Sequence, residues 1–276
     1  MNALLTSLVV VTLLSPSVCA QKDCEKDIRH ATKEIEKQCR DFLKLKDIDW
    51  KKISREFLRE AKKVESDSDH LVLLVRLLAR LEDGHAAVMP VEGARQVRWP
   101  EEPTRRGPGF FLCRIGDDLV VKNAWGPAAA AGIEPGMTLE RVDKEPAEKW
   151  FDGILAERRD LQSFSTDHQA FFAACHWGLA LPEGTRLKLE FKELSGKSKR
   201  ATLTCEDRNY IARGPAFPPK GLKAVDRKGN VSYARTEKGF GYIHLRRCPG
   251  DLPELVDEAL GALENPPGLI LDFRGN

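Results

Sequence analysis

Polar residues suited to chemistry follow the last apolar run of the chain. Leu269-Ile270-Leu271 is continuously apolar, which predicts a strand buried on both faces of a sheet. Asp272, Arg274 and Asn276 come after it, and Gly275 lets the backbone turn without a Cβ clash. Catalytic groups in open α/β sheets gather past such carboxyl ends. We expect these four residues to support an active-site loop, with Arg274 pairing with a carboxylate.

His85 is the second candidate, in the sequence Asp83-Gly84-His85. The run from Leu71 to Leu81 is apolar nearly all round, which predicts a buried helix. Ser68 or Asp69 would cap its start, and Gly84 would close its end in the left-handed conformation. A rigid helix is a good platform for a functional side chain. The alternative is a loop histidine that hydrogen-bonds only locally.

The other polar clusters are weaker candidates for a functional site. The segment 163–168 holds a serine, an aspartate and a histidine, but neighbours in sequence rarely form a triad, so it is interpreted as a helix start. The chain lacks Cys/His spacing typical of metal sites, and we expect neither a metal nor a cofactor. Six cysteines lie beyond residue 20, and either disulfides or scattered thiols would suit them.

The ends and the overall charge limit the class of protein. Residues 1–20 predict a cleaved signal peptide, with an apolar stretch over 4–14 and the small-residue site Val18-Cys19-Ala20, and hence a secreted or periplasmic protein. A membrane span fails on length. The net charge is +2 with both signs interspersed, so no basic stripe points to nucleic acid.

The elements that would position these residues fall into three regions of an α+β, multidomain chain. Residues 21–95 show helical spacing, with Asp49 placed to cap one helix. Residues 100–206 contain turns, short strands near 110–115, 119–123, 187–191 and 201–205, and a helical insert over 150–181. Residues 207–276 end in a β-α-β unit, after a connection over 206–238 that is interpreted as a linker or exposed loop.

The middle region resembles a PDZ domain. Ala131-Gly132-Ile133-Glu134-Pro135-Gly136-Met137-Thr138-Leu139 is similar to a segment of that family, and Gly107-Pro108-Gly109-Phe110 resembles its carboxylate-binding loop. The resemblance implies that Gly107, Gly109 and Phe110 bind a peptide terminus while the peptide adds a strand to the sheet. Pro108 has no N–H to contribute there, and a role of the module as a spacer or lid stays open.

The whole order resembles the tail-specific (C-terminal processing) serine proteases, in the branch similar to the tricorn protease core. Gly239-Phe240-Gly241-Tyr242-Ile243 and 268–276 are the specific motifs, and the likeness covers most of 65–276. The family motif continues into glycines that help form an oxyanion hole, with the serine nucleophile later still. We therefore expect the chain to be the front part of a larger enzyme, with its serine beyond Asn276.

The resemblance implies a base for that serine. One branch of the family uses a downstream lysine, whereas the tricorn-like branch uses a histidine at the place matched by His85, facing the end of the 268–276 strand. A neutral imidazole can activate a serine hydroxyl. The expected function is an exported serine endopeptidase acting on polypeptides. The alternative is a non-catalytic binding protein of the same architecture, for a peptide or an apolar ligand.

Overall fold

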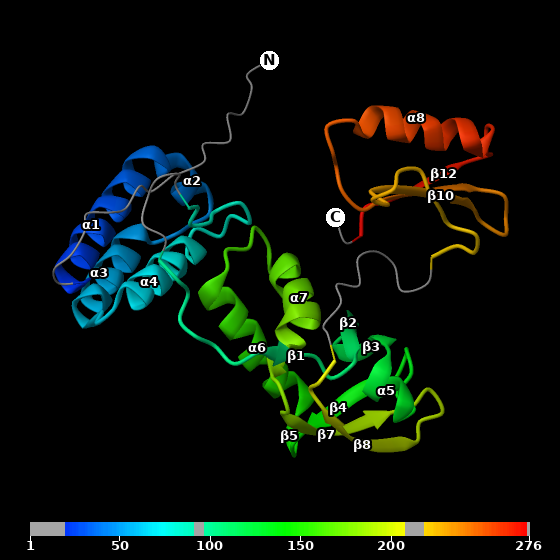
Figure 1. Ribbon diagram of the computed structural model, residues 1–276, viewed down its shortest axis with the longest axis horizontal. Coiled ribbons are helices and arrows are strands. Elements are labelled where there is room, and N and C mark those ends of the chain that lie inside the picture. Colours follow the sequence, from blue (N-terminus) through cyan, green and yellow to red (C-terminus); the bar gives the residue numbers. More distant parts are fainter. Residues whose placement is uncertain (1–19, 91–96, 208–217, 275–276) are drawn as a thin grey trace.

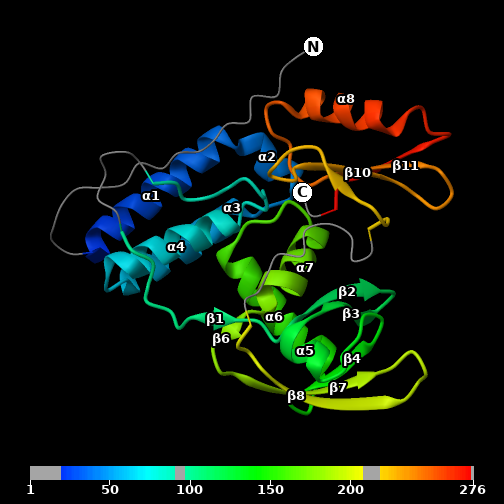
Figure 2. The ribbon, with the colours of Figure 1, turned by 45° about the vertical axis from the view of Figure 1, so that its right-hand side comes forward.

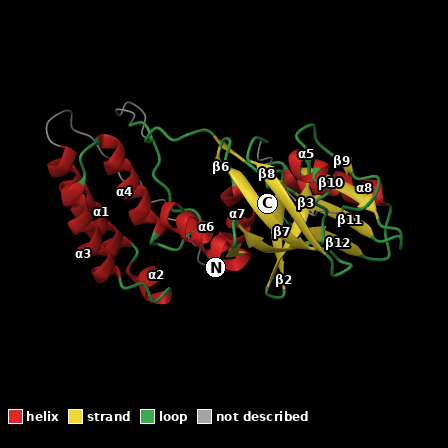
Figure 3. Ribbon diagram, turned by 90° about the horizontal axis from the view of Figure 1, so that it is seen from below, coloured by secondary structure: helices red, strands yellow, loops and turns green. Residues whose placement is uncertain are grey.

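The computed structural model describes residues 20–90, 97–207 and 218–274, and it has the mixed α+β architecture expected from the sequence (Figure 1). The helices of residues 20–79 lie at one end of the molecule, and the sheets lie toward the other (Figure 3). Buried apolar side chains form three main groups, one in each region of the chain. The predicted signal peptide, apart from Ala20, lies outside the described residues. Within the described ranges, none of the helices is long and apolar enough to cross a bilayer.

The first region is all helical: α1 (Ala20–Gln38), α2 (Arg40–Leu45), α3 (Trp50–Glu60), the short 3-10 helix η1 (Ala61–Lys63) and α4 (Asp67–Ala79). Asp49 caps α3 as predicted, because its carboxylate accepts the Lys52 backbone N–H at 3.0 Å. Ser66, rather than Ser68 or Asp69, caps α4 by accepting the Asp69 N–H at 3.1 Å.

The predicted left-handed conformation of Gly84 is wrong. Glu82 takes the positive φ, of 52°, and Gly84 does not. The chain continues from α4 through tight turns until Leu81 is buried in the helical core, 4% exposed. The reversal therefore falls at Glu82, directly after Leu81, the last buried residue of the helical core.

The middle region is a sheet with helices beside it (Figure 2). The strand order is β2-β3-β4-β7-β8, all antiparallel. β2 packs against α7, which also packs against α6. The strands expected near 110–115, 119–123, 187–191 and 201–205 are all present. The elements are β1 (Arg105–Arg106), β2 (Phe110–Ile115), β3 (Asp118–Ala124), α5 (Gly126–Ala130), β4 (Thr138–Val142), β5 (Glu145–Pro146), α6 (Ala147–Leu161), α7 (Asp167–His176), η2 (Trp177–Leu179), β6 (Leu181–Pro182), β7 (Arg186–Lys192) and β8 (Ser198–Thr204).

The third region is a four-stranded sheet of order β12-β11-β10-β9, with α8 packed over β10 and β11. The expected crossover is present, because β11 and β12 pair in parallel across α8. The interpretation of 206–238 as a linker is wrong in part, since two strands lie within it. The elements are β9 (Lys223–Ala224), β10 (Val231–Arg235), β11 (Gly241–Leu245), α8 (Leu252–Leu263) and β12 (Leu269–Asp272).

The expectation that β12 is buried on both faces is also wrong for these residues. Leu269, Ile270 and Leu271 are 43%, 45% and 49% exposed. β12 lies at the edge of its sheet, and α8 covers the neighbouring strands instead. The apolar run correctly predicts a strand, but its covering layer is absent from the described residues.

Candidate functional site

Asp272, at the carboxyl end of β12, is held from two strands. Its side chain is only 3% exposed. Tyr242 on β11 donates its hydroxyl hydrogen to Asp272 Oδ2 at 2.6 Å. The Arg274 backbone N–H donates to Oδ1 at 2.9 Å, and the guanidinium donates to both carboxylate oxygens at 2.5–3.1 Å. Arg274 therefore pairs with a carboxylate two residues away, through both its backbone and its side chain.

The charges of this cluster support one another. The Arg274 guanidinium, with the Tyr242 hydroxyl and the Arg274 N–H, holds the pKa of Asp272 well below its usual range despite burial. Burial, and then the hydrogen bond to the Asp272 carboxylate, raises the pKa of Tyr242 above its usual range. Asp272 is thus a fixed negative charge and Tyr242 a fixed donor at neutral pH.

His244 extends the cluster on the β11 side. It lies opposite Asp272 in the parallel register and is 6% exposed. Its Nε2 is 3.0 Å from the Arg274 carbonyl oxygen. A carbonyl oxygen only accepts, so Nε2 carries the hydrogen and donates it. This histidine therefore ties down the backbone at Arg274 instead of offering a free base through Nε2.

A pair of residues in the middle region, the buried His176 and the half-buried Lys122, extends the polar network. His176 on α7 is 2% exposed, with Nδ1 2.7 Å from the Phe172 carbonyl oxygen and Nε2 3.3 Å from Lys122 Nζ on β3. Nδ1 therefore donates and Nε2 accepts, which is the neutral imidazole. Burial lowers the pKa of His176 to about 4. Burial also lowers the pKa of Lys122, on which the charges of Arg274 and Asp272 act as well.

His85 lies after α4 on the surface. Its side chain is 84% exposed, with Nδ1 3.4 Å from Asp83 Oδ1. The same carboxylate oxygen accepts the His85 backbone N–H at 3.1 Å. In the described part of the chain, the polar contacts of the His85 side chain are with Asp83, and none joins it to Asp272 or Arg274. The residues that precede His85 are held by the connection between α6 and α7.

The predicted peptide-binding loop is built mainly by packing. Gly107 donates its N–H to the Asp207 carbonyl oxygen at 2.8 Å, so that N–H is already used. Gly109 has a φ of 87°, and an added Cβ would lie 2.6 Å from the Trp125 carbonyl oxygen, so only glycine fits. Phe110 is fully buried, edge-on to Phe191 with ring centroids 5.9 Å apart.

Gly275 and Asn276 lie outside the described residues. Among the residues that are described, His, Cys, Asp and Glu form no group of three that could hold a metal ion. The thiols of Cys24, Cys175 and Cys205 are free and buried, and burial raises the pKa of Cys24 to about 12 and of Cys205 to about 11.

The sequence reasoning missed Tyr242, His244 and Lys122. A signal for the first two exists, because Tyr242-x-His244 lies within one strand and Asp272-x-Arg274 lies at the end of another, and the two strands were expected to be parallel neighbours. Only the register, which pairs His244 with Asp272, decides that the two three-residue patterns meet. Lys122 has no local signal in the sequence, because its approach to Asp272 and Arg274 depends on how the middle region packs.

Comparison with known proteins identifies the fold. No protein-family model matches the chain, and no curated protein matches its sequence. Mature CPAF matches over 91% of this chain and 55% of its own, with 14% identity and a TM-score of 0.53. A point mutant of CPAF matches over 91% and 56%, with 12% identity and a TM-score of 0.59. The photosystem II D1 C-terminal processing protease covers 92% and 60% at 13% identity, but its TM-score of 0.30 supports no argument.

The chain therefore has the fold of CPAF along most of its length. It spans a little over half of the CPAF chains that it matches, 55–56%. At 12–14% identity the likeness concerns the backbone fold.

Proposed function

We propose that this chain forms the amino-terminal part of a serine-type endopeptidase of the tail-specific family, in its tricorn-like branch. The observation that carries the proposal is the fold shared with CPAF over 91% of the chain. The motifs at 239–243 and 268–276 add support from the sequence. The serine nucleophile belongs to a segment that these residues do not contain, in keeping with the 55–56% coverage of the CPAF chains.

His85 acts in this proposal as the general base. Its imidazole takes the proton of the serine hydroxyl as the oxygen attacks the scissile carbonyl, and returns it to the leaving amine. The 84% exposure of the side chain leaves room for an approaching segment. Asp83 Oδ1, 3.4 Å from Nδ1, favours a hydrogen on Nδ1 and leaves Nε2 as the proton acceptor.

Asp272 and Arg274 act in this proposal as structural support for an active-site loop, a role proposed from the sequence for Gly275 and Asn276 as well. The buried carboxylate anchors the Arg274 backbone N–H, while Tyr242 ties the carboxylate to β11. A backbone fixed in this way can present the amides of a following glycine loop without reorganising. The cluster thus prepares an oxyanion-binding loop rather than taking part in bond breaking.

The middle region positions polypeptide substrates, with Gly107, Gly109 and Phe110 shaping the loop beside β2. β2 is the first strand in the order of its sheet, where an added peptide strand would pair. Free and amidated peptides with apolar ends separate the two roles considered for this module. A loss of about 1 kcal/mol or more on amidation supports capture of the terminus. Equal affinities favour a lid.

The complete reading frame, produced with its signal removed, tests the proposal. It should cleave an unfolded protein such as reduced, alkylated casein and react with a fluorophosphonate probe. Lactacystin, which occurs in complex with mature CPAF, serves as a second inhibitor. His85→Ala should lower turnover by on the order of a thousandfold, as loss of a general base does.

His168→Ala is the matched control, because His168 is also exposed. It should leave turnover unchanged. A His85→Ala enzyme with near-normal turnover would exclude the base and point to a downstream lysine. Absence of both cleavage and probe labelling, with retained peptide binding, would establish the alternative of a non-catalytic binding protein.

A further inference from the structure

The segment that carries His85 is fastened to a distant part of the chain through Ser163. This serine, on the connection between α6 and α7, is 3% exposed. Its Oγ accepts the Asp83 backbone N–H at 2.9 Å and donates to the Ala79 carbonyl oxygen at 3.4 Å. One hydroxyl thus bridges the last turn of α4 and the residue two positions before His85.

Ser165 makes a second attachment, one residue closer to His85. Its Oγ accepts the Gly84 backbone N–H at 2.8 Å. Its own backbone is fixed on both sides: the N–H donates to Gln169 Oε1 at 2.9 Å, and the carbonyl oxygen accepts from Lys46 Nζ at 2.8 Å. Ser165 is therefore a rigid partner, not a mobile surface serine.

The start of α7 supplies that rigidity. Thr166 caps α7 by accepting the Gln169 N–H at 3.1 Å, while the Gln169 side chain reaches back to Ser165. Such a reciprocal arrangement satisfies donors at a helix start. The same Gln169 side chain lies over Gly84, where an added Cβ would be 2.8 Å from Nε2. Gly84 is thus close-packed against α7.

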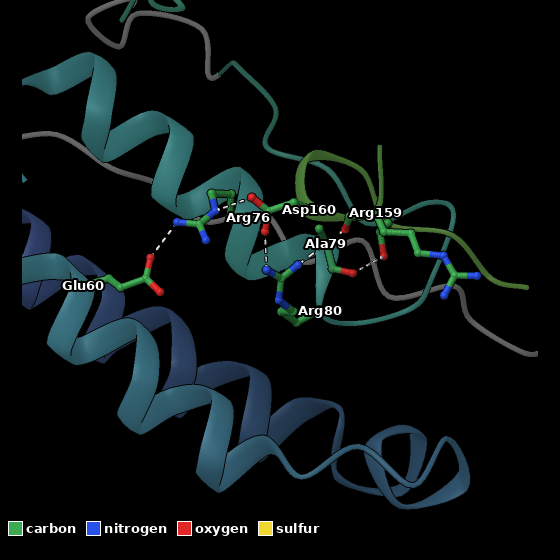
Figure 4. A network of polar contacts seen from close by, with 7 residues as sticks. Glu60, Arg76, Ala79, Arg80, Arg159 and Asp160 are labelled. Carbon is green, nitrogen blue, oxygen red and sulfur yellow. Dashed lines mark hydrogen bonds and ion pairs between the residues drawn. The ribbon is translucent and has the colours of Figure 1, made fainter. Parts of the chain in front are cut away.

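A network of charges fixes the helix before the segment (Figure 4). Arg76 on α4 pairs with Asp160 of α6 at 2.8 Å and with Glu60 of α3 at 2.6 Å. Arg80, one turn later, pairs with the other oxygen of Asp160. α4 is therefore held to α6 up to its end, and Ser163 and Ser165 hold the backbone of the residues that follow.

We propose that Ser163 and Ser165 are positioning residues for His85. They fix the backbone amides of Asp83 and Gly84, and so set the point from which the imidazole projects. The inference deepens the proposed function and rests on it. A base must be held within about 0.5 Å of its working position, and a misplacement of about 1 Å can lower a rate a hundredfold. The α6–α7 connection is thereby a part of the catalytic apparatus that does not touch the substrate.

The test uses the complete protein with Ser165→Ala and Ser163→Ala, each alone and combined. We expect each single variant to lower kcat about tenfold and the pair about a hundredfold, with KM within a factor of two. Ser165→Thr keeps a hydroxyl and should restore most of kcat. Ser195→Ala is the matched control, since it removes a hydroxyl that accepts a backbone N–H, from Lys197 at 3.4 Å, in an exposed turn. It should change nothing.

Hydrogen exchange at the Asp83 and Gly84 amides gives a readout that needs no activity. Exchange there should quicken at least fivefold in the serine-to-alanine variants, while the amides within α4 keep their rates. Full turnover in the double variant, beside an inactive His85→Ala, would overturn the positioning role and leave the proposed function standing. A wild-type protein that cleaves nothing would overturn both. Failure of Ser165→Thr to recover kcat would overturn the role of that hydroxyl.

Discussion

Replacing Tyr242 with phenylalanine tests how much its hydrogen bond to Asp272, at the end of β12, stabilises the third region. The change keeps the buried ring and removes only the hydroxyl that donates to Asp272 at 2.6 Å. A hydrogen bond to a charged partner contributes about 1.5–3 kcal/mol. Arg274 still pairs with the carboxylate, so Asp272 stays ionised and the loss stays within that range. We expect Tyr242→Phe to destabilise the third region by about 2 kcal/mol at pH 7.

The measurement must resolve that region, because three separate cores need not unfold together. Amide exchange within β10 and β11 under increasing urea meets this need. Tyr233→Phe is the control, since it makes the same change on the neighbouring strand β10. A loss below about 0.5 kcal/mol for Tyr242→Phe, or an equal loss for both variants, would refute the reasoning.

The stabilisation by Tyr242 should also depend on pH, in a direction that follows from its raised pKa. The pKa of Tyr242 is raised in the folded state, so its stabilisation is complete below about pH 10, the ordinary tyrosine value, and is lost as pH rises further. The difference between wild type and Tyr242→Phe should therefore shrink by up to about 1.4 kcal/mol per pH unit above pH 10. A constant difference from pH 7 to about 11.5 would contradict it. The depressed pKa of Asp272 acts at the other end, where stabilisation present above about pH 4 is lost in acid.

Two further variants probe the middle region. Gly109→Ala should destabilise it by about 2 kcal/mol or more, because Gly109 combines a φ of 87° with a backbone oxygen 2.6 Å from the new Cβ. Gly116→Ala, at a φ of 61° in open space, should cost only about 1 kcal/mol in the same thermal melt, and equal losses would show that crowding is unimportant. His176 is buried with a pKa of about 4, so the unfolded state takes up its proton first and stability should fall by about 2 kcal/mol between pH 7 and pH 5. His176→Gln should flatten that slope in urea titrations and the exposed His168→Gln should not, whereas equal slopes would contradict the assigned burial effect.

Local pattern is enough for much of the fold. The helical stripes over 21–65 and the alternation at 187–191 and 201–205 predict the observed elements, because periodicity reports directly which face is buried. β10 was missed, since Val231-Ser232-Tyr233-Ala234 lies in a segment rich in Lys and Pro and is made a strand by its pairing with β11. The exposure of β12 also depends on a layer that no local pattern reveals.

The contacts of the candidate site also divide into local ones, which the sequence indicates, and long-range ones, which it does not. The sequence predicts that Arg274 pairs with a carboxylate, and the structure shows that the partner is Asp272, two residues earlier. The partners from β11 depend on a parallel register spanning 30 positions, as for Tyr242 and Asp272. The hold of Ser163 and Ser165 on the His85 segment joins positions about 80 apart, and it required the packing of α4 on α6. Sequence reasoning proposed His85 and the residues after β12 as candidates, but it did not find the serines and the tyrosine that hold them in place.

The uncovered edge at β12 has a practical consequence for handling these residues alone. The strand has exposed apolar side chains on it and directly after it, at Leu269, Ile270, Leu271 and Phe273. One of its two edges has no partner strand among the described residues. Unpaired N–H and C=O groups along an apolar strand are a template for another copy. At high protein concentration such preparations should become turbid and bind thioflavin T. Charged substitutions such as Ile270→Lys should keep them clear.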